Sequence, residues 1–164
     1  MLTLSDFQGM AEQGRMQKAQ SCSVKLAEVY HTLEDKPIDD KFKSMFSGKN
    51  TLLTYLLTFK FEVNSNSGSK KSHKVFIQVN PDFDIKYWEG NKCRIACDCE
   101  DFKYHSVYFV KQYDSLFETD RLKVIYASSL TKEPVHTAAT IACKHCLAAL
   151  DYLINNYQQL MRTL

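Results

Sequence analysis

Two short motifs of cysteine and histidine constrain this chain more than any other feature of its sequence. One residue separates Cys97 from Cys99, and one residue separates Cys143 from His145, far along the chain. Free cysteines rarely pair up by chance at two separate places, and thiolates together with an imidazole are a donor set typical of tetrahedral zinc. The spacing therefore predicts that the two motifs meet around one structural Zn²⁺, with these four side chains as its ligands.

The local geometry expected of each motif favours the same site. Alternate residues of a β-strand share a face, so a strand would aim Cys97 and Cys99 in one direction. Cys143 stands at the start of a helical pattern, where exposed N–H groups and the helix dipole stabilise a thiolate. Basic residues nearby in the sequence offset the negative charge of three thiolates around one Zn²⁺: Arg94, Lys103 and Lys144.

Other residues could replace one of these ligands, and the sequence leaves them open. Cys93 shares a predicted strand with Cys97, and Cys146 directly follows His145. Neither has a partner at equivalent spacing, so packing is the expected role of both. Histidines that could take the fourth position are His105 and His136. Cys22 stands apart from the other cysteines and is predicted to lie in the core.

The N-terminus and the apolar segments indicate the compartment. Residues 1–20 carry no signal-peptide pattern, and no apolar run reaches the ~20 residues of a membrane-spanning helix. We therefore expect a cytoplasmic protein that has no membrane partner. Thiols stay reduced in such a compartment, so the cysteines favour metal binding over disulfide bonds.

Hydrophobic periodicity predicts a single α+β domain at 1–164, with an antiparallel β-sheet core, an N-terminal helix and a C-terminal helix, fastened by zinc. Apolar residues at helical spacing follow a predicted cap at Ser5 and Asp6, which indicates a helix that ends near Ala19. From Cys143 onward, a second apolar stripe predicts a helix to the C-terminus. The expected parts are a helix at 1–20, a β-rich region at 21–96 and a zinc module at 97–164 with a long insertion at 100–142.

Segments rich in leucine, threonine and aromatic residues predict the sheet. A polar loop separates strands at 51–63 and 75–79, which indicates a long antiparallel hairpin. Further strands are expected at 85–88, 93–97 and 122–126. Residues 22–33 fit a strand and a helix, and we assign them to a strand because the neighbouring segments are β. Residues 102–110 follow neither period clearly, so strand and helix both stay open there.

The order C-x-C followed by C-x-H resembles the SWIM-type zinc finger. Cys97-Asp98-Cys99 and Cys143-Lys144-His145 stand in this order, and Leu147-Ala148-Ala149-Leu150 is similar to the helix that follows the second pair in that family. The stretch Glu100-Asp101-Phe102-Lys103-Tyr104 more narrowly resembles a version found in virion structural proteins of large tailed bacteriophages. The resemblance covers residues 93–153.

This resemblance implies a structural protein of a phage virion, at the head-tail connector or neck, in the tail or on the capsid, assembled in the host cytoplasm. Its partners would be other virion structural proteins in a symmetric assembly. The 21 Lys and Arg against 19 Asp and Glu leave a formal charge of +2. That balance falls short of a dedicated nucleic-acid binder, whereas the many Tyr and Phe residues suit protein interfaces.

Two other functional classes are compatible with a zinc motif. A nucleic-acid-binding SWIM module is the alternative, and it would use basic residues with aromatic stacking groups: Lys70, Lys71, Lys103, Arg121, Lys123, Tyr104 and Tyr108. A zinc enzyme needs an open coordination position and a general base, for which Glu100 or Asp101 would serve. Four protein ligands leave no open position, so we expect no catalytic activity.

Overall fold

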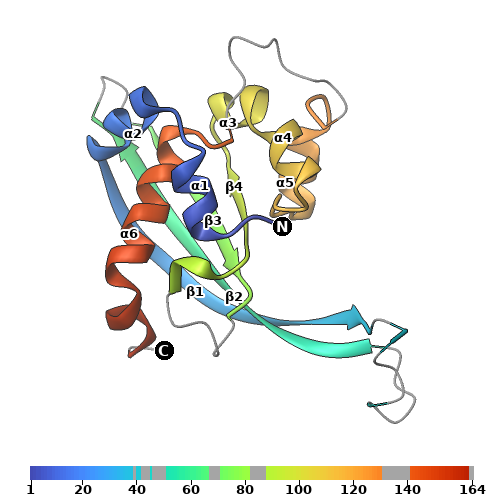
Figure 1. The fold of residues 1–164 in the computed structure, drawn as a ribbon. Helices are drawn as coiled ribbons and strands as arrows, with labels where there is room; N and C mark the ends of the chain where they lie inside the picture. Colours follow the sequence, from blue (N-terminus) through green and yellow to red (C-terminus); the bar gives the residue numbers. More distant parts are fainter. Residues whose placement is uncertain are drawn as a thin grey trace.

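A computed structural model describes residues 1–38, 40–41, 45, 51–66, 71–81, 88–130 and 141–162. It confirms the predicted α+β class, because one antiparallel four-stranded sheet carries helices from both ends of the chain (Figure 1). The strands, in their order across the sheet, are β1 (Cys22–Pro37), β2 (Thr51–Ser65), β3 (Ser72–Val79) and β4 (Cys93–Cys97). The helices are α1 (Leu4–Gly9), α2 (Gln13–Gln20), the 3₁₀ helix η2 (Trp88–Gly90), α3 (Glu100–His105), α4 (Val107–Gln112), α5 (Asp120–Tyr126) and α6 (Lys144–Met161).

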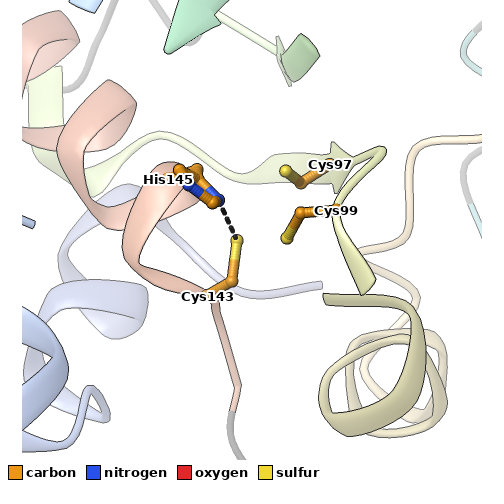
Figure 2. Close-up of side chains that lie close together, drawn as sticks. All are labelled: Cys97, Cys99, Cys143 and His145. Atoms are coloured by element: carbon orange, nitrogen blue, oxygen red, sulfur yellow. Dashed lines mark hydrogen bonds between the residues drawn. The ribbon is translucent and has the colours of Figure 1, made fainter. Parts of the chain in front are cut away.

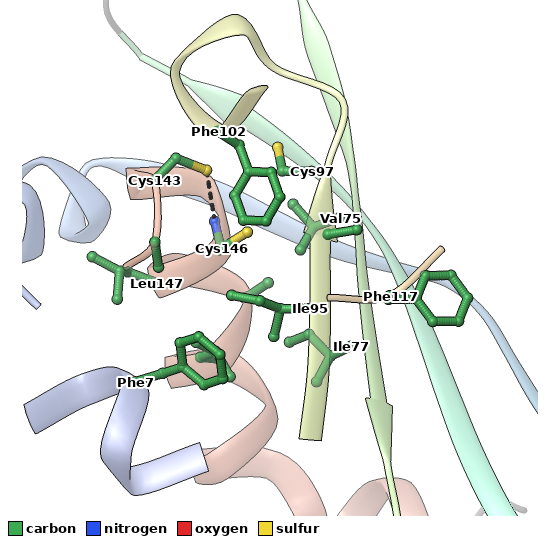
Figure 3. Packing of buried hydrophobic residues seen from close by; sticks show 14 of the residues in the cluster. Phe7, Val75, Ile77, Ile95, Cys97, Phe102, Phe117, Cys143, Cys146 and Leu147 are labelled. Carbon is green, nitrogen blue, oxygen red and sulfur yellow. Dashed lines mark hydrogen bonds between the residues drawn. The ribbon is translucent and has the colours of Figure 1, made fainter. Parts of the chain in front are cut away.

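One face of the sheet holds the core. On β2, Phe59 and Phe61 are completely buried and alternate with the partly exposed Lys60. The strand register places Val75 and Ile77 of β3 and Ile95 and Cys97 of β4 on the same side, because paired residues share a face. Helix α6 lies along this face (Figure 1), and α1 packs beside it (Figure 3). The core includes Leu4, Phe7, Val63, Val75, Ile77, Ile95, Cys97, Leu147, Leu150 and Leu153.

A bulge in β1 keeps its apolar residues on the core face. The register with β2 shifts between Leu26 and Glu28, which leaves Ala27 as an extra residue. In a regular strand Leu26 and Val29 would face opposite sides, but the bulge turns both toward the core. The predicted strand at 22–33 is therefore confirmed, and its mixed period has this physical cause.

The N-terminal segment forms two short helices, so the single helix predicted at 1–20 is wrong. Helix α1 starts after Thr3, whose Oγ1 accepts a hydrogen bond from Asp6 N at 3.1 Å, while Asp6 Oδ2 accepts one from Thr3 N at 2.8 Å. The predicted cap at Ser5 is thus two residues late. Gly9 ends α1, in keeping with the low helix propensity of glycine.

Elements of the second half differ from the prediction in two places. Residues 122–126 belong to helix α5, not to a strand, because Thr119 Oγ1 accepts a hydrogen bond from Leu122 N at 3.2 Å and caps the helix. Of the strand predicted at 85–88, Trp88 lies in η2 and the rest falls outside the described residues. The open segment 102–110 is helical. The hairpin, the strand at 93–97 and the C-terminal helix are confirmed.

The two sides of the sheet end differently. The outer edge of β4 is covered, because Ile95 N donates to Ser115 O at 2.8 Å and Phe117 N donates to Ile95 O at 3.0 Å. On the other side, β1 and β2 continue beyond the body as a two-stranded arm, formed by residues 32–37 and 51–56 (Figure 1). Strand β3 pairs with β2 only from Leu57 onward.

Among the helices of the described residues, none combines the length and the apolar character that a membrane crossing requires.

Candidate metal centre

The structure brings the four predicted ligands together. Cys97, Cys99, Cys143 and His145 are all buried, and one donor atom of each lies within 4.8 Å of the others. Cys97 and Cys99 approach from the end of β4 and the turn after it, whereas Cys143 and His145 approach from the start of α6 (Figure 2). These four side chains could bind a metal ion.

A turn, not a strand, aims the first pair of thiols. Cys97 is the last residue of β4, whereas Cys99 is the N-cap of α3, so the expectation that both lie on one strand is wrong. Asp98 forms the turn: its N–H donates to Lys74 O at 3.1 Å, and its Oδ1 accepts from Lys74 N at 3.0 Å. Both thiols point toward the start of α6 as a result (Figure 2).

Two of the sulfur atoms cap helices. Cys99 Sγ accepts a hydrogen bond from Phe102 N at 3.3 Å, and Cys143 Sγ accepts one from Cys146 N at 3.4 Å. Helix N-termini stabilise negative charge through their free N–H groups and their dipole. Both sulfurs therefore accept a hydrogen bond at a helix N-terminus, a position that the sequence predicted for Cys143 but not for Cys99.

His145 is buried with a ring nitrogen that lacks a partner. Its Nδ1 lies 4.0 Å from Cys143 Sγ, and its Nε2 has no hydrogen-bond partner among the described residues. The ring of His73 packs against it with the centroids 4.4 Å apart, and His73 Nδ1 lies 3.2 Å from Asp98 Oδ1. A buried polar atom without a partner is unfavourable by ~1–3 kcal/mol. A metal bond to the imidazole would compensate for this burial.

Burial and mutual hydrogen bonds perturb the thiol pKa values. Burial raises the pKa of Cys97 well above the usual thiol value, and a hydrogen bond with Cys143 raises the pKa of Cys99. Burial also opposes ionisation of Cys143, but hydrogen bonds from the neighbouring thiols outweigh it and lower the pKa of Cys143. Of these three thiols, Cys143 is thus the one whose ionisation is favoured, and protons would be released from the cluster when a metal ion binds.

Cys146 borders the cluster without being one of the four. Its thiol is in hydrogen-bond contact with Cys143 and Cys97, and it is completely buried. Figure 3 shows it among the core residues close to Phe102. Its position suits the packing role predicted for it, and it also makes Cys146 the nearest substitute for His145.

The other open candidates lie elsewhere. Cys93 is buried and pairs with Val79 at the opposite end of β4, away from Cys97. His105 Nδ1 lies 2.8 Å from Asp101 Oδ1, outside the group of four. His136 falls outside the described residues. Cys22 is only half-buried, so the prediction that it lies in the core is wrong in degree, although it packs against the core.

Tyr126 is a residue near the site that the sequence did not reveal. Its hydroxyl donates to Cys97 O at 2.6 Å and accepts from Cys97 N at 3.1 Å, which holds the backbone of a candidate ligand from the side opposite β3. The sequence predicts a strand at 122–126, and such a strand gives no reason to place Tyr126 beside Cys97. The sequence signal that points to a helix instead is Thr119, a residue type that caps helices.

The residues predicted for catalysis or nucleic-acid binding either contact other side chains or come from separate segments of the chain. The carboxylate of Asp101, a candidate base, binds both Arg15 and His105. Lys103 Nζ lies 4.9 Å from the ring centroid of Tyr104. The remaining basic candidates come from separate segments: Arg121 and Lys123 lie on α5, Lys71 precedes β3 and Lys70 falls outside the described residues.

Comparison with protein-family models, with curated proteins and with solved structures finds no match to this chain. The SWIM resemblance therefore stays a prediction that depends on the cysteine and histidine spacing.

Proposed function

We propose that Cys97, Cys99, Cys143 and His145 hold one structural zinc ion. The observation that carries this proposal is the burial of four such donor atoms within 4.8 Å of one another. Thiolates and imidazole suit zinc, whereas calcium and magnesium prefer oxygen ligands. Zn–S bonds of about 2.3 Å place sulfur atoms roughly 3.8 Å apart in a tetrahedron, so only small side-chain movements are needed.

The proposed ion is structural because its coordination would be complete. Catalytic zinc keeps one position for water or substrate, and four protein ligands fill a tetrahedron. Asp101, one of the two candidate bases, already binds Arg15 and His105. These observations favour a stabilising role over a catalytic one.

The zinc ion would join three segments of the chain: the end of β4, the start of α3 and the start of α6. Residues 100–142 separate the two ligand pairs in sequence, so the ion would close a long loop. Structural zinc supplies ~10–16 kcal/mol of apparent folding free energy near pH 7. In this chain that energy would hold α6 on the core face of the sheet.

Metal analysis of the purified full chain tests the ligand set. We expect one zinc ion per chain, with loss of most zinc in Cys99→Ser and none in the control Cys22→Ser, whose thiol lies outside the group of four. An unchanged zinc content in Cys99→Ser would rule out this set.

A second pair of variants identifies the fourth ligand. We expect His145→Ala to lower the zinc affinity strongly, whereas Cys146→Ser keeps the metal. The opposite pattern would show that Cys146 is the ligand and that the histidine only packs beside it.

We propose further that the chain is a structural protein of a tailed-phage virion, at the connector or neck, in the tail or on the capsid. Three features support this role: the resemblance around Cys97 and Cys143, the near-neutral charge of +2, and a buried group of four donors that would hold the proposed zinc ion without an open coordination position. Its partners would be neighbouring virion proteins in a symmetric assembly.

Mass spectrometry of particles purified from a culture that expresses this chain tests the virion proposal. We expect the chain in intact particles at a fixed ratio to the capsid protein, and its absence from them would contradict the proposal. The alternative, nucleic-acid binding, predicts a DNA affinity that falls steeply with salt. No DNA binding at low salt would remove that alternative.

A further inference from the structure

The arm exposes apolar side chains that the rest of the sheet buries. Leu53 and Tyr55 stand on the same face of β2 as Phe59, but Leu53 is 59% exposed whereas Phe59 is fully buried. Leu33, which pairs with Tyr55 across the arm, is 60% exposed. Helix α6 covers this face over the body but not over the arm (Figure 1). The arm is therefore the part of the described sheet where the core face has no cover.

The backbone of the arm is also open along one edge. Strand β3 pairs with β2 only up to Leu57, and no backbone pairing of residues 51–55 with any strand other than β1 occurs among the described residues. An extended strand with an unpaired edge presents N–H and C=O groups that can accept another strand.

Natural proteins protect strand edges against pairing with other chains, and this chain protects the outer edges of β4 and β1. The outer edge of β4 is covered by residues 115–117 and by Tyr126. The outer edge of β1 carries charged residues, which discourage strand addition: Lys25, Glu28, Glu34, Asp35 and Lys36. The open edge of β2 has neither protection, because residues 51–59 contain no charged side chain.

We infer that residues 51–55 of the arm pair with the same residues of a second copy of this chain, in an antiparallel two-fold arrangement. Pairing centred on Leu53 uses all five residues and stops before Leu57, which pairs with Val79 at the end of β3. It sets Leu53 opposite Leu53 of the other copy and Tyr55 opposite Thr51. Aromatic and β-branched residues directly opposite each other are favourable pairs in antiparallel sheets.

A second copy fits this edge better than an unrelated strand for two reasons. Pairing residues 51–55 with the same residues of a second copy brings no charged side chain into the contact, because neither strand carries one. A two-fold axis also closes the contact, because each copy uses the open edge of its arm once. The inference does not depend on the metal ion, since the arm lies away from the cluster (Figure 1).

Sedimentation equilibrium of the full chain tests the pairing with two matched variants. Leu53→Lys places like charges opposite each other in the pair, so we expect a dimer for the unmodified chain and a monomer for Leu53→Lys. Leu33→Lys is the control, because Leu33 is equally exposed on the same face of the arm but belongs to the charged edge of β1. We expect Leu33→Lys to remain a dimer.

Amide hydrogen exchange in residues 51–55 provides a second readout. We expect exchange there to slow as the protein concentration rises, while Leu53→Lys exchanges fast at every concentration and keeps an unchanged circular dichroism spectrum. A zinc-loaded chain that is monomeric would overturn the pairing and leave the metal proposal intact. Equal loss of the dimer in both lysine variants would also overturn it, since association would then use the apolar face.

Discussion

The two ends of the β-sheet differ in which side chains they bury and in whether their backbone is paired. At the end of β4, thiols and an imidazole are gathered and buried, and Tyr126 and residues 115–117 satisfy the backbone of the strand. At the arm, leucine side chains lie in solvent and the backbone of residues 51–55 is open. Buried polar groups need partners, and exposed apolar groups on an open edge invite them. The first end could bind a metal ion, and for the second we infer pairing with another protein chain.

Removing the metal should produce the largest difference in stability between the metal end and the arm. With a strong chelator we expect the body to lose most of its stability, ~10 kcal/mol, because the free energy of zinc binding is also free energy of folding. Hydrogen exchange should then become fast throughout α6. A metal-free chain with α6 fully protected would contradict the account of this end.

Truncation of two residues on one face of β2 should show the next largest difference. Phe59→Ala removes a fully buried ring and is expected to lower the free energy of unfolding by ~3–5 kcal/mol. Leu53→Ala, on the same strand and face but in the arm, should lower it by less than ~1 kcal/mol in the monomer. Denaturant unfolding at low protein concentration measures both. Equal losses would mean that the arm is covered within one chain.

Tyr126→Phe should have a smaller effect on the metal end. It removes a hydroxyl that both donates to and accepts from the backbone of Cys97, so we expect a loss of ~1–3 kcal/mol in denaturant unfolding. The control is Tyr113→Phe, at an exposed tyrosine, which should change little. Identical melting curves for the two variants would show that the hydroxyl bridge does not stabilise the strand.

The pH dependence should differ between the metal-free and metal-loaded chains. Without metal, the raised pKa values of Cys97 and Cys99 stabilise the folded state below the usual thiol pKa of 9.0 and cease to do so as the pH rises above it. The lowered pKa of Cys143 makes stability rise with pH only below 9.0, where that thiol is still protonated in the unfolded chain. Above pH 9 the raised pKa values of Cys97, Cys99 and Cys146 act alone, so the metal-free chain should lose stability as the pH rises.

With metal bound, the thiolates are held in the folded state, so stability should instead fall as the pH decreases and protons compete for the sulfurs. Thermal melts of both forms across the alkaline and acidic ranges measure the two slopes. Above pH 9 the metal-loaded chain should keep its stability while the metal-free chain loses it, and an equal fall in both forms would contradict the assignment of the thiols as ligands.

The sequence predicted the parts of this fold that follow a clear period. The hairpin strands alternate and the C-terminal helix has a continuous apolar stripe, so both were found. The spacing of Cys97, Cys99, Cys143 and His145 identified the cluster, because two matched pairs of soft ligands are rare by chance. Each strand, helix or ligand pair is defined by the spacing of residues close together in the sequence, so it can be recognised without the structure.

The remaining features depend on contacts that no local pattern encodes. The bulge at Ala27 mixed the period of β1, and the cap at Thr119 made a helix from residues with strand-like composition. Asp98 orients the first pair of thiols through its hydrogen bond with Lys74 on β3, and nothing in the local sequence indicates this contact. The open edge of the arm becomes visible only when the register of β3 is known.

X-ray absorption at the zinc edge of the purified full chain is the most direct test of the proposed ligand set. We expect one zinc ion per chain, with three sulfur ligands at ~2.3 Å and one nitrogen ligand at ~2.0 Å. Four sulfur ligands would replace His145 by Cys146. A folded chain that binds no metal would contradict the account of this end of the molecule.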